Sequence, residues 1–92
     1  MRILGELPKR GLKVSVFKTD SRILVKFEDL YLEQTYKFRE SENISTLSDV
    51  NALLTDEFMA QVYEIFDQMH KTHRFGLENH IELKEEDFPE II

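Results

Sequence analysis

The sequence predicts an α+β domain in which a three-stranded antiparallel β-meander packs against one long C-terminal helix. Two observations predict this fold. Three short segments of alternating apolar residues occur before residue 40, and one segment with helical spacing follows residue 55. The 92 residues suit a single domain, which we place at residues 1–76. Residues 77–92 are an acidic segment, expected as a tail or a fold-back, and the alternation at 80–83 allows an extra strand.

Three runs are predicted to be strands, at residues 12–18, 23–28 and 31–39. Each run alternates apolar and polar side chains, and polar turn residues separate it from the next. Connections this short join antiparallel neighbours. One face of the sheet is therefore expected against the core, and the other is expected to present Phe17, Leu24 and Lys26.

A long helix is predicted over residues 56–75 because every local signal agrees. Thr55 is a good N-cap residue, two acidic residues follow it, and Gly76 stands where a glycine often ends a helix. The residues expected to cover the sheet recur at helical spacing and are Phe58, Val62, Ile65 and Met69. A short helical turn capped by Ser48 is expected within residues 47–54.

A second row of residues lies beside the first on the same helix and consists of Met59, Tyr63, Phe66 and His70. The two rows make an arc of roughly 160°, wider than the roughly 100° of an ordinary amphipathic helix. We expect the C-terminal segment or a partner molecule to cover the second row. With Phe17, Leu24 and Lys26 it forms the predicted interaction surface. Small two-layer domains often gain stability by pairing, so we predict a homodimer with an unidentified protein partner.

Charge is unevenly distributed along the chain, whose formal net charge is −6. Residues 9–39 hold eight basic and four acidic residues, whereas residues 40–92 hold three basic and thirteen acidic ones. The acidic total disfavours general binding to nucleic acids or anionic membranes. The basic first part and the acidic remainder are expected to attract each other, either within one molecule or between two copies.

Several classes of protein are disfavoured by what the sequence lacks. It has no cysteine, which excludes disulfides and thiolate metal sites. It has no apolar run of about 18 residues and no signal peptide, so no membrane contact and a cytoplasmic location are expected. Neither a nucleophile elbow nor a phosphate-binding glycine loop is present, so we expect no enzyme activity and no cofactor.

A metal site is the alternative function. Asp67, His70 and His73 follow one another at intervals of three on the predicted helix, and imidazole with carboxylate suits zinc, iron or nickel. A simpler interpretation is that histidines near the end of a helix stabilise its dipole.

A lesser alternative is single-stranded nucleic-acid binding by the outer face of the sheet. Lys13, Lys26 and Lys37 occur there with Phe17 and Tyr31, and bases stack on aromatic rings beside cations. A solvated lysine-bearing face explains the same residues and is favoured.

Segments of the chain resemble a family of small uncharacterised bacterial proteins. The segments are MRILGELP at 1–8, LEQTYK at 32–37, FMAQV at 58–62 and QMH at 68–70. The resemblance covers most of residues 1–75 and fades in the acidic segment. That family has no assigned activity, so the resemblance implies a bacterial cytoplasmic protein and assigns no site residue.

Overall fold

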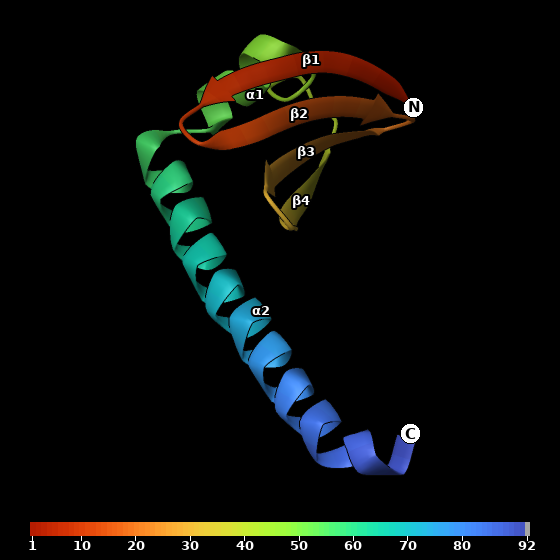
Figure 1. Cartoon of the computed structure of the whole chain (residues 1–92). Helices are drawn as coiled ribbons and strands as arrows, with labels where there is room; N and C mark the ends of the chain where they lie inside the picture. Colours follow the sequence, from red (N-terminus) through yellow and green to blue (C-terminus); the bar gives the residue numbers. More distant parts are fainter. Residues whose placement is uncertain (92) are drawn as a thin grey trace.

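The computed structural model describes residues 1–91, with side chains described for residues 1–80. In chain order the described elements are β1 (Arg2–Lys9), β2 (Leu12–Thr19), β3 (Arg22–Asp29), β4 (Leu32–Arg39), α1 (Leu47–Leu53) and α2 (Asp56–Ile91). The strands form one sheet, and both helices lie on the same side of it (Figure 1). The α+β class is confirmed, but the sheet has four strands where three were predicted.

The sheet is an antiparallel meander in the order β1-β2-β3-β4. Each strand has eight residues, and two-residue turns at 10–11, 20–21 and 30–31 join them. Turns this short can join only antiparallel neighbours, which is why consecutive strands lie side by side.

The strand missed from the sequence is β1, because Gly5 and Pro8 both weaken a strand pattern. The register with β2 shifts between Ile3 and Gly5, which marks a β-bulge, and Gly5 has a φ of +149°. A bulge at a glycine and a proline on an edge strand are both compatible with pairing. β1 therefore forms despite these residues, at the edge of the sheet.

The core lies between the inner face of the sheet and the helices. Its buried apolar residues are Leu7, Val14, Val16, Ile23, Val25, Phe27, Val50, Leu54, Met59, Val62 and Phe66. The ring of Phe27 lies 5.8 Å from that of Tyr36 and 6.3 Å from that of Phe58. The amide of buried Gln34 donates to the carbonyl of Val62 at 3.0 Å and accepts from the Tyr36 hydroxyl at 2.6 Å. These bonds satisfy a buried polar group and join β4 to α2.

The short helix α1 begins two residues earlier than predicted, because its N-cap is Thr46 rather than Ser48. The Thr46 hydroxyl accepts from the Asp49 N–H at 3.1 Å, and the Asp49 carboxylate accepts from the Thr46 N–H at 3.1 Å. This reciprocal pair is a capping box. The N–H groups of Ser45 and Thr46 bind the Asp49 carboxylate and lower its pKa below the ordinary value of 3.8.

The long helix α2 begins as predicted and ends later. The Thr55 hydroxyl accepts from the Phe58 N–H at 3.1 Å, which confirms the N-cap. The predicted end at residue 75 is wrong, because the helix continues through Gly76 to Ile91. Residues 80–83, where the alternation allowed an extra strand, belong to α2 instead, and Ile92 lies outside the described residues. An interior glycine costs a helix only about 1 kcal/mol, which the helix-forming residues after it compensate.

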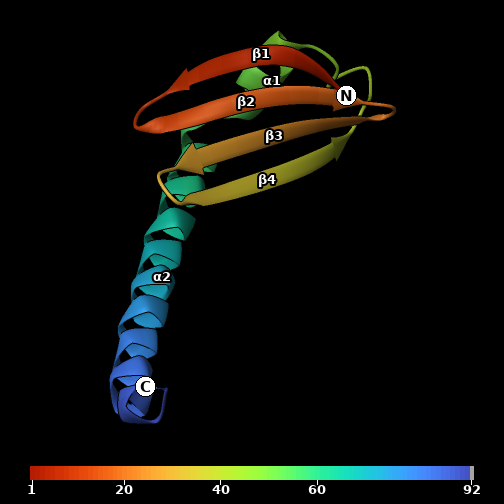
Figure 2. The same ribbon diagram turned by 45° about the vertical axis from the view of Figure 1, so that its right-hand side comes forward.

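The continuation of α2 changes the shape of the molecule. Its 36 residues span about 54 Å at 1.5 Å per residue, far more than the sheet is wide. Figure 2 shows that α2 leaves the sheet and projects beyond it. The molecule measures 61 × 28 × 18 Å as a result.

Candidate interaction surface

Two side-chain contacts fix the turn between β3 and β4 against α2. His70 Nε2 lies 2.7 Å from Asp29 Oδ2. The ring of Tyr31 stacks on that of His73, with centroids 5.5 Å apart and planes within 4° of each other. Because His70 and His73 are neighbours on one side of the helix, both contacts hold the turn against that side. Beyond this point α2 runs away from the sheet (Figure 2).

An apolar groove lies beside this turn, between β4 and α2. Its volume is about 420 Å³, and its lining residues are Leu32, Ile65, Gln68, Met69, Thr72 and His73. Ile65 is 43% exposed, although its spacing from Val62 predicts that it covers the sheet. The groove therefore leaves apolar side chains of both elements open to solvent.

Exposed apolar side chains occur near the groove, on the β3–β4 turn and on α2. Seven large hydrophobic residues are exposed among the described side chains, and five of them belong to the β3–β4 turn or to α2. These five are Leu30, Tyr31, Ile65, Phe75 and Leu77. Leu30 is 83% exposed and has a φ of +53°, which is uncommon for a residue other than glycine. A strained and exposed leucine does little for the fold and is typical of a contact surface.

We define the α2 surface as the residues that lie together on this side of the molecule: Leu30, Tyr31, Leu32, Ile65, Met69, His73 and Leu77. At about 100° per residue, Leu77 lies about 40° around the helix from His73 and one turn further along the chain. It therefore continues the side of α2 that faces the sheet earlier in the helix. Phe75 lies about 160° around the helix from Leu77 but only about 20° from Gln68, which lines the groove, so it borders this surface on the other side. Sequence reasoning missed Leu30 and Leu32. A leucine within a two-residue turn, where polar residues and glycine are usual, was the available signal.

The second helical row lies elsewhere than predicted. Met59 and Phe66 are buried in the core of the single chain, so they are not a surface. The hydroxyl of Tyr63 donates to the carbonyl of Arg10 at 2.6 Å, and His70 contacts Asp29. The helix is rotated so that Val62 and the second row face the sheet, which leaves Ile65 outside. The wide apolar arc made both rotations compatible with the pattern.

The predicted sheet residues lie on the outer face, opposite the helices. Phe17 and Leu24 are cross-strand neighbours there, and Leu24 also pairs with Lys37. Lys26 lies 3.2 Å from Glu33 and 3.8 Å from Glu28. The Glu33 carboxylate, assisted by Glu28, raises the pKa of Lys26 above 10.5. Lys26 is therefore a paired cation on the outer face of the sheet, opposite the helices.

The predicted metal ligands are not brought together. Among the described residues, no group of three or more His, Asp or Glu side chains is placed to hold a metal ion. His70 is directed at Asp29 and His73 is stacked on Tyr31, so each histidine has a separate contact. Asp67 is exposed. The structure thus uses the two histidines to position the β3–β4 turn.

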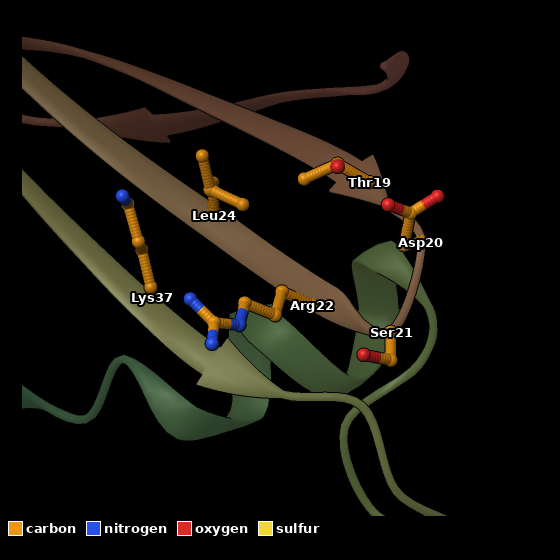
Figure 3. Close-up of a pocket in the computed structure, with 6 residues that line it drawn as sticks. All are labelled: Thr19, Asp20, Ser21, Arg22, Leu24 and Lys37. Carbon is orange, nitrogen blue, oxygen red and sulfur yellow. The ribbon is translucent and has the colours of Figure 1, made fainter.

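The predicted nucleic-acid face is divided by ion pairs. Lys13 lies 3.8 Å from Glu6, and Lys26 is paired as described above. Tyr31 belongs to the β3–β4 turn and stacks on His73, so it is not among the lysines. Lys37 instead lines an open pocket together with Arg22, at the end of the sheet that holds the β2–β3 turn (Figure 3).

Comparisons of the chain with protein-family models, curated proteins and solved structures found no match. None of the described helices is both long and apolar enough to cross a membrane. We therefore infer the function of the α2 surface from its own geometry.

Proposed function

We propose that this chain is a non-enzymatic interaction module that forms a homodimer through the α2 surface, in the bacterial cytoplasm. One observation carries the proposal: exposed apolar side chains gather where α2 leaves the sheet. An isolated helix is marginally stable in water, because most helical stability in proteins comes from packing an apolar face. The projecting part of α2 therefore requires a neighbour.

A second copy of the chain suits this surface. Among the described side chains, nothing lies within 4 Å of a Cβ built at Gly76, so the fold of one chain does not require a glycine there. A glycine within a helix allows another backbone to approach closely. Symmetric pairing of two α2 helices, with Gly76 at the centre, places the projecting part of each helix over the groove of the other. The middle of each groove then lies about seven residues along the helix from Gly76.

Charge favours the antiparallel arrangement. The part of α2 after Gly76 is strongly acidic in sequence, so parallel helices would place like charges side by side. Antiparallel helices instead place this part beside residues 56–75 of the second copy, which are less acidic, with four acidic and two basic residues.

The test compares two exposed residues of the same helix by sedimentation at about 100 μM. We expect the native chain to have a mass of about 22 kDa, twice the 11.0 kDa of one chain. Leu77→Glu puts a charge into the proposed interface and is expected to weaken the dimer about a hundredfold. Ala60→Glu is the control and is expected to leave the dimer intact, because Ala60 is exposed and lies about 160° around the helix from Gly76.

Two results would contradict the proposal. One is a native chain that sediments as a monomer at this concentration. The other is an equal effect of the two substitutions, which would show that the dimer, if formed, does not use the α2 surface. Circular dichroism of each variant separates loss of pairing from loss of the fold.

A further inference from the structure

A cluster of cations lies on the outer face of the sheet, at the end opposite the β3–β4 turn. Ser21, Arg22, Lys37 and Arg39 line an open pocket of about 410 Å³. Figure 3 shows Arg22 and Lys37 on the same face as Leu24, with the Asp20 carboxylate turned away from their head groups. Arg22 and Arg39 are direct cross-strand neighbours in the register of β3 and β4. Three cationic side chains therefore line one pocket.

These cations differ from the lysines around them. Among the described residues, Lys13, Lys18 and Lys26 each have a carboxylate partner within 4 Å. Arg22, Lys37 and Arg39 form no ion pair with any residue in that part of the chain. Like charges directly opposite each other destabilise a sheet. An anion in the pocket would remove this repulsion.

We propose that the pocket binds a phosphoryl group carried by a small molecule. Guanidinium groups bind phosphate oxygens in pairs, and a doubly charged phosphate matches three cations better than a single carboxylate does. The Ser21 hydroxyl supplies a further donor. Leu24 lines an adjoining pocket that shares Ser21, Arg22 and Lys37, and it offers an apolar contact for the organic part. The pocket volume lies within the usual range for small-molecule sites, about 300–1,000 Å³.

The distribution of free cations distinguishes this ligand from a nucleic-acid strand. A strand requires cations along its path, because each phosphate carries a charge. Here the cations at the other end of the outer face, Lys13 and Lys26, are already paired with glutamates. On the described outer face of the sheet, the cations without an ion pair line one pocket, which suits one phosphoryl group.

The test is an NMR titration of the ¹⁵N-labelled full chain with phenyl phosphate and, separately, with inorganic phosphate, each up to about 20 mM. We expect shifts centred on residues 21–24 and 37–39, with millimolar affinity or better. Arg39→Gln is expected to weaken binding at least about tenfold, because it removes one charge-assisted pair. Lys13→Gln, a change of the same type on the same face, is the control and is expected to change affinity less than about twofold.

The two probes identify the source of the phosphoryl group. Tighter binding of phenyl phosphate indicates a phosphate ester whose organic part contacts Leu24, and equal affinity indicates free phosphate. The proposal is overturned if neither probe binds, if Arg39→Gln binds as the native chain does, or if a single-stranded oligonucleotide of about 15 residues binds far more tightly than phenyl phosphate. The ¹⁵N spectrum of each variant shows that it is folded.

Discussion

The β-bulge in β1 gives a quantitative prediction for Gly5→Ala. Gly5 has a φ of +149°, which side chains rarely adopt, and a Cβ there would lie 2.9 Å from Cδ2 of Leu47. Backbone strain of this kind costs about 1–3 kcal/mol. The contact adds less, because the Leu47 methyl is the end of a flexible side chain. We expect a loss of about 2 kcal/mol, or about 10 °C in Tm for a domain of this size.

Gly11→Ala is the matched control, because Gly11 has a φ of +72° and nothing lies within 4 Å of a Cβ built there among the described side chains. Its loss should come from the backbone alone, at about 1 kcal/mol. Thermal unfolding of both variants by circular dichroism, at one low protein concentration, makes the comparison. A smaller loss for Gly5→Ala than for Gly11→Ala would refute the bulge and the position of α1 beneath it.

Two further predictions concern the helices. Gly76→Ala should raise the stability of the monomer by about 1 kcal/mol, since alanine favours helix, yet weaken the dimer by filling the close contact; unfolding at low concentration and sedimentation measure the two effects. The lowered pKa of Asp49 means that its stabilising contribution is complete above pH 3.8 and is lost as the pH falls through the lower folded value. Asp49→Asn should remove that part of the acid dependence, seen by comparing urea unfolding at pH 5 and below pH 3.8.

The regular parts of the fold follow directly from the sequence. The alternation in β2 to β4 and the cap at Thr55 each depend on neighbouring residues, so local patterns predict them. β1 was missed because the tertiary contacts of an edge strand compensate for Gly5 and Pro8. The C-terminal end of α2 was missed because a glycine is equally compatible with a helix end and with a helix interior open to a neighbour.

The candidate site was less predictable for a different reason. The wide apolar arc of α2 showed that more surface exists than one sheet covers, but not which row faces the sheet. That choice depends on the packing of Met59 and Phe66 against strands far away in the sequence. The exposure of Leu30 and the stacking of Tyr31 on His73 likewise depend on where the β3–β4 turn meets the helix.

Cross-linking at Gly76 tests the proposed pairing of α2 helices most directly. The native chain has no cysteine, so Gly76→Cys and Ala60→Cys each introduce a single thiol. A disulfide needs Cα atoms about 4.4–6.8 Å apart, which the symmetric contact provides only near residue 76. We predict that under mild oxidation Gly76→Cys forms a covalent dimer rapidly and Ala60→Cys does so slowly. Equal rates for the two variants, or no covalent dimer from Gly76→Cys, would contradict the account.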